Sequence, residues 1–113
     1  GMFEAGAATL ADPYRELVIQ AGQALKSEPG AITVAAHTDS DPISGALALS
    51  YPDNIALSDA RAEDAADVLD GVVGHGRLQV AGRGDGEPVD RGTSAAAKAR
   101  NRRVELIIPR SGS

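Results

Sequence analysis

The chain has 113 residues, which is enough for one ordinary domain and too few for two. Hydrophobic residues make up 42% and charged residues 24%, a balance that is typical of a globular domain and excludes a disordered tail. The absence of Cys excludes disulfides, thiolate zinc sites and cysteine catalysis, and the net charge of −5 makes the whole chain acidic.

The N-terminal quarter of the chain predicts a short strand followed by a helix. Met2 and Phe3 form a brief apolar start that favours an edge strand. Asp12 then suits the cap of a helix, and Pro13 suits its first position, where the missing N–H costs nothing. Apolar side chains follow at helical spacing until Pro29 and the glycine after it end the helix.

Residues 31–36 predict a buried strand that carries polar residues at its C-terminal end. The strand alternation indicates that His37 and Asp39 point to the same face, on either side of Thr38. Residues 40–55 hold two prolines, a glycine and an asparagine, which predict a long connection built from turns. A connection of this length in a small domain is usually functional or mobile.

A second helix is predicted from Ser58, as its cap, to about Val73. Arg61 would then lie in the first turn, at the edge of the apolar stripe, where a cation opposes the helix dipole beside unpaired backbone N–H groups. We therefore expect Arg61 to attract an anion, which is either the carboxylate of Asp39 or that of a ligand; a purely structural Arg–Asp pair stays open. The Arg61→Ala variant is expected to lose the ligand and keep its fold.

The C-terminal third of the chain predicts two strands around a short helix. Residues 77–83 alternate and predict a strand, and a glycine-rich connection over residues 84–92 leads to Ser94 and a short alanine-rich helix. Residues 104–108 predict the last strand.

The element order β-α-β-α-β-(α)-β predicts an α+β sandwich, in which two helices pack on one face of a small mixed sheet. Residues 2–110 are expected to form this single domain. Gly1 before the first Met is interpreted as a tag scar, which makes the chain an excised domain, and residues 111–113 as a flexible tail.

Catalytic and metal-binding patterns are not evident in the sequence. His37 and Asp39 supply two possible metal ligands, but the only other histidine, His75, lies in a turn between glycines. No Ser lies at a strand-to-helix elbow of the hydrolase type, and residues 82–86 lack the spacing of a phosphate loop. We therefore expect no enzyme, no metal and no cofactor, and a hydrogen-bonded structural role for His37.

Acidic and basic residues are unevenly distributed along the chain. Residues 1–76 hold 12 acidic and 3 basic residues, a net charge of −9, whereas residues 77–113 hold 4 and 8, a net charge of +4. Clustered Arg raises the question of nucleic acid. The acidic whole and the scarcity of aromatic residues disfavour it, so we expect two halves of complementary charge and no nucleic acid partner.

Three short motifs occur in order along the chain. Residues 32–39 read ITVAAHTD and are similar to a strand that ends in a G-H-T-D type motif; residues 54–62, NIALSDARA, match N-x-x-L-S-x-x-R-A; residues 101–105 match N-R-R-V-E. Residues 3–10 are similar to an opening F-x-x-G-x-x-x-L. In this order the motifs resemble the OmpA/MotB-like peptidoglycan-binding domain, over essentially the whole chain.

The resemblance implies a module that binds peptidoglycan without covalent chemistry, through meso-diaminopimelate of the stem peptide. By their motif positions, Asp39 would pair with the ligand ammonium and Arg61 would hold the ligand carboxylate, while Leu57 would line the pocket. The implied binding residues are Asp39, Arg61, Asn54, Leu57, Thr38, Arg102 and Arg103.

The long connection narrows the resemblance to a subfamily. D-P-I at residues 41–43, followed by Y-P-D-N at residues 51–54, is similar to the loop of flagellar stator and type VI secretion membrane proteins. Residues 82–85, with P-V at residues 88–89, are more similar to the secretion relatives. The resemblance thus favours the C-terminal domain of a type VI secretion inner-membrane (TssL-like) protein.

That subfamily implies a periplasmic domain of a Gram-negative envelope protein, anchored in the inner membrane in the full-length protein. The implied partners are peptidoglycan and other envelope or secretion-complex subunits, and a homodimer stays open. One alternative is a wall anchor of the flagellar stator type. The other is a structural or dimerisation module that has lost wall binding, because Ala36 and Ser40 stand where the family usually has Gly and Asn.

Overall fold

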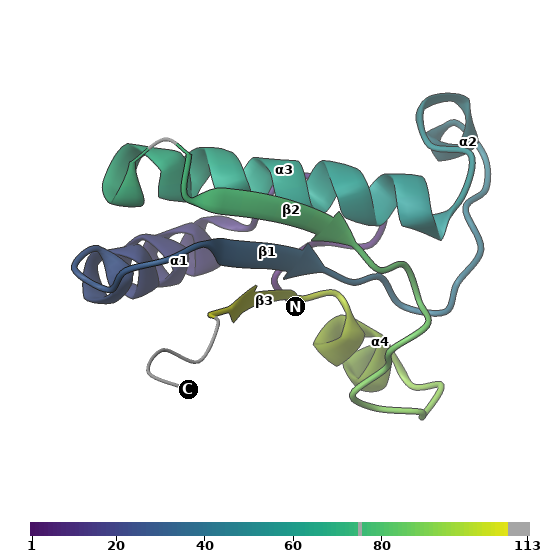
Figure 1. Ribbon diagram of the computed structural model, residues 1–113. Coiled ribbons are helices and arrows are strands. Elements are labelled where there is room, and N and C mark those ends of the chain that lie inside the picture. The colour runs from purple at the N-terminus through teal and green to yellow at the C-terminus, as the bar shows by residue number, and fades with distance from the viewer. Residues whose placement is uncertain (75, 109–113) are drawn as a thin grey trace.

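The computed structural model describes residues 1–74 and 76–108, which are built around a three-stranded mixed sheet in the order β2-β1-β3. The central strand β1 (Ile32–Ala36) pairs in parallel with β2 (Leu78–Gly82) and antiparallel with β3 (Val104–Ile107), as Figure 1 shows. The apolar β1 is the most buried strand because it has a neighbour on each edge. The mixed sheet expected from the sequence is confirmed.

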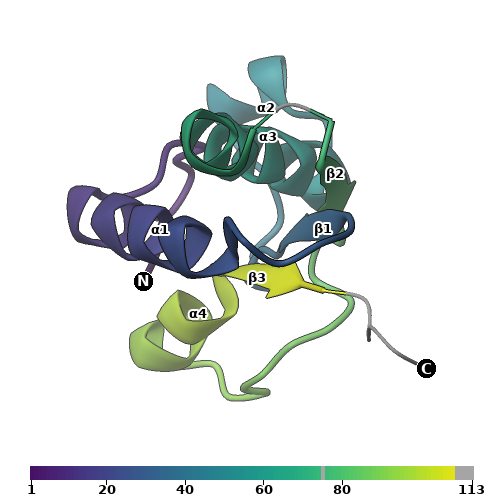
Figure 2. The same ribbon diagram turned by 60° about the vertical axis from the view of Figure 1, so that its left-hand side comes forward.

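Two long helices complete the hydrophobic core. Helices α1 (Asp12–Leu25) and α3 (Asn54–Val73) pack against each other, and α3 also contacts all three strands. Figure 2 shows both helices on the same side of the sheet. The residues of the central cluster are Phe3, Leu10, Val18, Val34, Ala65, Ala66 and Leu69. This arrangement confirms the α+β class.

The predicted edge strand at the N-terminus is wrong. Met2 and Phe3 form no strand; instead the carbonyl of Met2 accepts a hydrogen bond from the N–H of Ala11, and the side chain of Phe3 is fully buried in the core. An apolar pair can be buried by packing alone, so its hydrophobicity did not specify a strand. The predicted helix cap is also displaced by one residue, because Asp12 is the first helical residue and Ala11 precedes it without a side-chain cap.

The second long helix begins one turn earlier than predicted. A short helix α2 (Leu47–Ser50) lies within the long connection, and α3 starts at Asn54 after the cap residue Asp53, whose Oδ1 accepts a hydrogen bond of 2.8 Å from the N–H of Ala56. Ser58 is therefore inside the helix. It is fully buried, donates to the carbonyl of Ile55 and accepts from the N–H of Gly84 at 2.9 Å.

The remaining element ends agree closely with the sequence prediction. Helix α3 ends at Gly74, whose φ of 92° is readily adopted only by glycine. Helix α4 (Ala95–Asn101) is capped by the hydroxyl of Ser94, which accepts from the N–H of Ala97. His75, the predicted tail at 111–113 and the last two residues of the predicted domain lie outside the described residues. Within the described chain, no helix is long and apolar enough to cross a bilayer.

Candidate functional site

A cavity of about 200 Å³ lies at the C-terminal end of β1, where Figure 1 also places α2 and the first turns of α3. Five of the seven binding residues implied by the sequence line it: Thr38, Asp39, Asn54, Leu57 and Arg61. The other lining residues come from two loops and the start of α2, and are Ala5, Gly6, Asp41, Pro42, Ile43, Ser44 and Leu47. The fold thus brings together residues that are far apart in the sequence.

Arg61 forms one wall of the cavity and is almost completely buried, with 1% of its surface exposed. Its guanidinium donates to three backbone carbonyls: Nε to Ala7 at 2.8 Å, Nη2 to Glu4 at 3.3 Å and Nη1 to His37 at 3.5 Å. The guanidinium carbon also lies 4.9 Å from the ring centroid of Phe3, within range of a cation–π contact. Neutral groups therefore hold this cation in place.

The charge of Arg61 has no carboxylate partner among the described residues, because none lies within 4.0 Å of its guanidinium. Burial lowers the pKa of Arg61 to about 10, while the nearby charge of Asp39 opposes this shift. The side chain consequently stays charged at neutral pH. A buried and charged guanidinium without a carboxylate partner, at the wall of a cavity, has the chemistry to pair with an anion.

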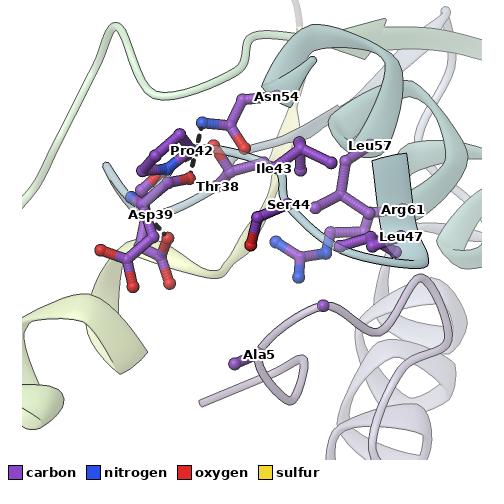
Figure 3. A pocket seen from close by; sticks show the side chains of 12 residues that line it. Ala5, Thr38, Asp39, Pro42, Ile43, Ser44, Leu47, Asn54, Leu57 and Arg61 are labelled. Carbon is purple, nitrogen blue, oxygen red and sulfur yellow. Dashed lines mark hydrogen bonds between the residues drawn. The ribbon is translucent and has the colours of Figure 1, made fainter. Parts of the chain in front are cut away.

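Asp39 lies across the cavity from Arg61, as Figure 3 shows, and is 8% exposed. Its Oδ2 accepts a hydrogen bond of 2.8 Å from Nη1 of Arg102, and its Oδ1 accepts one of 3.0 Å from the N–H of Asp41. The sequence left open an ion pair between Asp39 and Arg61. In the structure the carboxylate of Asp39 pairs with the guanidinium of Arg102 instead. This leaves Arg61 available to a ligand.

Asp41 is a lining residue that the sequence reasoning missed. Its Oδ1 lies 3.0 Å from Nζ of Lys98, and its carbonyl accepts a hydrogen bond of 3.1 Å from Nδ2 of Asn54. The alternation that pointed to Asp39 could have pointed to Asp41 as well, since it lies two residues further on. The cavity therefore has an acidic side, formed by Asp39 and Asp41, and a basic side at Arg61.

Arg102 and Arg103, the other two implied binding residues, do not line this cavity. Arg102 lies behind Asp39, and its Nε donates to the carbonyl of Phe3 at 2.7 Å. Arg103 contacts the outer side of the sheet, where Nη2 donates to the carbonyl of Glu87 at 2.9 Å and lies 3.5 Å from Glu105. Only Arg102 is therefore linked to the cavity, through its partner.

His37 is fully buried at the end of β1. Its Nε2 lies 2.6 Å from Oε1 of Glu105, but neither ring nitrogen makes a hydrogen bond of regular geometry. The hydrogen bond expected for His37 is therefore not found; the buried ring makes a close contact with a carboxylate instead. Burial and the charge of Arg103 lower the pKa of His37, and Glu105 only partly opposes them.

No group of three or more His, Asp or Glu within residues 1–74 and 76–108 is placed to hold a metal ion.

The chain is similar to known cell-envelope proteins. The model of the OmpA family matches residues 2–102. The peptidoglycan-associated lipoprotein of Legionella pneumophila is 35% identical over 101 residues, which cover 88% of this chain and 53% of that protein. The chain therefore spans about half the length of the curated relative it matches.

Solved structures agree with this match. The cell wall anchor of the T6SS from Pseudomonas aeruginosa is 40% identical, with a TM-score of 0.77 over 92% of this chain and 71% of that chain. The C-terminal domain of Helicobacter pylori MotB has a TM-score of 0.83 over 92% of this chain and 79% of that chain; at 20% identity it shows the fold alone.

Proposed function

The chain belongs to the OmpA family, and from this premise we propose that it binds peptidoglycan non-covalently and does not cleave it. The observation that carries the proposal is the guanidinium of Arg61, which is buried, charged and without a carboxylate partner within 4.0 Å among the described residues. It faces a cavity whose opposite wall is acidic. A small zwitterion carries both complementary charges.

We infer that the zwitterion is the free end of meso-diaminopimelate in the stem peptide. Arg61 binds its carboxylate, and Asp39, with Asp41 beside it, accepts its ammonium. Asn54 and Thr38 support the acidic wall: Asn54 donates to the carbonyl of Asp41, and the hydroxyl of Thr38 donates to that of Asp39 at 2.9 Å. Leu57, the fifth implied binding residue in the cavity, contacts the aliphatic part of the ligand.

Arg102 takes part in this binding through Asp39. Its hydrogen bonds to Asp39 and to the carbonyl of Phe3 fix where the Asp39 carboxylate points. The carboxylate of Asp39 then interacts with two cations, the ammonium of the ligand and the guanidinium of Arg102. Arg103 is retained as a flanking contact for parts of peptidoglycan outside the cavity.

The cellular context we propose is the periplasmic wall anchor of a type VI secretion complex, held by an inner-membrane protein. Its support is the 40% identity to the T6SS cell wall anchor, which extends over 92% of this chain. Other envelope or secretion-complex subunits are then partners, and a second copy of the chain is another. A flagellar stator anchor is the alternative, supported by the fold that the chain shares with MotB.

Co-sedimentation with purified sacculi tests the binding proposal. We expect the folded domain to pellet with diaminopimelate-type sacculi, and free meso-diaminopimelate to release it. A stem peptide with lysine in place of diaminopimelate should not release it, because the lysine side chain ends in an ammonium without the carboxylate that Arg61 would bind. Arg15→Ala, on the far helix α1, is the matched control and should pellet like the wild type. Folded wild-type protein that stays in the supernatant at low salt would favour the alternative of a structural module.

A further inference from the structure

A second cavity adjoins the first on the other side of the end of β1. It also has a volume of about 200 Å³, and Thr38 lines both cavities. The other lining residues are Ser40, Asp85, Pro88, Asp90, Arg91, Gly92 and Asn101. Most of them belong to the connection between β2 and α4, to which the sequence analysis assigned no binding residue.

The wall of this second cavity is fixed by the buried side chain of Asn101. Its Oδ1 accepts hydrogen bonds from the N–H groups of Val89 and Asp90, at 2.9 and 3.1 Å, and its Nδ2 donates to the carbonyl of Asp90 at 2.8 Å. The N–H of Gly92 donates to Oδ1 of Asp90 at 2.8 Å. The loop is therefore held in one conformation before any ligand arrives, as a binding site requires.

The charges of the cavity leave one cation available. Asp90 is paired with Arg100, and the bonds from Arg100 and Gly92 lower the pKa of Asp90. The guanidinium of Arg91 makes no hydrogen bond or ion pair with the described part of the chain, and neither does the carboxylate of Asp85. The cavity thus presents a free guanidinium for an anion and a free carboxylate that accepts N–H groups.

We propose that this second cavity is a subsite for the stem-peptide residue next to diaminopimelate, whose carboxylate binds Arg91. The inference rests on the proposed function of the first cavity. Since Thr38 lines both cavities and Ser40 lines the second, a peptide that leaves the first cavity reaches the second by passing over residues 38–40. Asp85 accepts an N–H group of the same peptide.

Two residues of the stem peptide carry such a carboxylate, namely the γ-linked glutamate before diaminopimelate and the alanine after it. Arg91 recognises the carboxylate that both residues carry. Synthetic peptides that lack one or the other carboxylate show which of the two residues binds. A tetrapeptide with isoglutamine in place of the glutamate lacks the first carboxylate and keeps the second. A tetrapeptide with a C-terminal amide lacks the alanine carboxylate and keeps that of the glutamate.

Calorimetric titration of wild type, Arg91→Ala and Arg61→Gln with free meso-diaminopimelate and with the tetrapeptide tests the subsite. Arg91→Ala should bind free diaminopimelate like the wild type and the tetrapeptide about three- to fivefold more weakly, the effect of a partly exposed charge contact. Arg61→Gln should lose both ligands. The control Arg83→Ala, on the same loop but outside the cavity lining, should match the wild type.

The outcomes separate the two proposals. If the wild type binds both ligands and Arg91→Ala binds the tetrapeptide equally well, the subsite is refuted and the first cavity stands. If the folded wild type binds neither ligand, the proposed function fails and the subsite fails with it. The isoglutamine tetrapeptide and the C-terminally amidated tetrapeptide then assign the carboxylate: the one whose binding is no longer weakened by Arg91→Ala lacks the group that Arg91 binds.

Discussion

Arg61 is a buried structural side chain and also the residue that we propose to bind the ligand carboxylate. The sequence suggested a first-turn cation beside free N–H groups, but α3 begins at Asn54, so Arg61 lies two turns into the helix and well beyond those groups. The expectation that Arg61 attracts an anion now rests on a different argument: the side chain is buried against neutral carbonyls, which leave its charge unpaired. The motif position identified the residue, whereas its three carbonyl partners lie 24, 54 and 57 residues away in the chain and follow no local pattern.

The burial of Arg61 changes the outcome expected for its replacement. Arg61→Ala removes the donors of three backbone carbonyls and leaves a space in the core, so we expect the unfolding free energy to fall by about 2–5 kcal/mol. Arg61→Lys keeps the charge and loses the planar fork, so it should fold better than Arg61→Ala and still bind sacculi more weakly than the wild type. Urea denaturation and sacculus binding at low temperature measure the two effects separately. If Arg61→Ala had the same unfolding free energy as the wild type, the structural role of Arg61 would be contradicted.

His37 makes stability depend on pH. Because burial lowers the pKa of His37 in the folded state below its ordinary value, the unfolded chain binds the proton more readily. The stability contributed by the neutral ring is present above about pH 6.5, the pKa of an unperturbed histidine, and is lost as the pH falls through the lower folded value. We expect the unfolding free energy to drop between pH 7.5 and 5, and the drop to be smaller in His37→Asn. Equal pH profiles for the two proteins would show that His37 plays no part.

At the scale of elements, periodicity predicted the strands and helices, and long-range contacts decided where they begin. The buried strand β1 and the long apolar stripe of α3 follow from residue spacing alone. Asp53 and Ser58 both suit a helix cap by their chemistry. The hydroxyl of Ser58 instead accepts from the N–H of Gly84, 26 residues away, and only the folded chain brings these groups together.

Two helical glycines provide a matched pair for the packing of α1 against α3. A Cβ at Gly71 would meet nothing within 4 Å, so Gly71→Ala should stabilise the protein by about 0.5–1 kcal/mol through helix propensity. A Cβ at Gly22 would lie 2.9 Å from Cδ2 of Leu69 and 3.2 Å from Cγ1 of Val72. Gly22→Ala should therefore lose that gain or destabilise. Thermal unfolding of both variants decides the matter, and equal gains would show that the two helices are less tightly packed than described.

At the scale of the whole molecule, the two halves of the chain meet at the site with opposite charge. The acidic half supplies Asp39 and Asp41, and the basic half supplies their partners Arg102 and Lys98. The sequence anticipated this complementarity from composition, but it could not say which residues pair, because 63 positions separate Asp39 from Arg102. The same contacts join the ends of β1 and α4, so charge pairing and site assembly coincide.

Leu69 tests whether the molecule unfolds as one unit. It is fully buried in the cluster that joins the N-terminal segment, both long helices and β1. Leu69→Ala should lower the unfolding free energy by about 2–5 kcal/mol, a large part of the roughly 5–15 kcal/mol of an ordinary domain. Far-ultraviolet circular dichroism and tyrosine fluorescence should report the same urea midpoint. Separate midpoints would show that part of the chain unfolds on its own.

The N-terminal segment has a mechanical consequence. Arg102 holds the carbonyl of Phe3, and Arg61 holds those of Glu4 and Ala7, so both cations next to the ligand also fasten this stretch. A pulling force on residues 3–7 would therefore act on the pocket through the side chains of Arg61 and Arg102, without passing through the sheet. A wall anchor under tension would thus transmit force directly to the groups that grip the wall, and an occupied pocket would resist extraction of the segment.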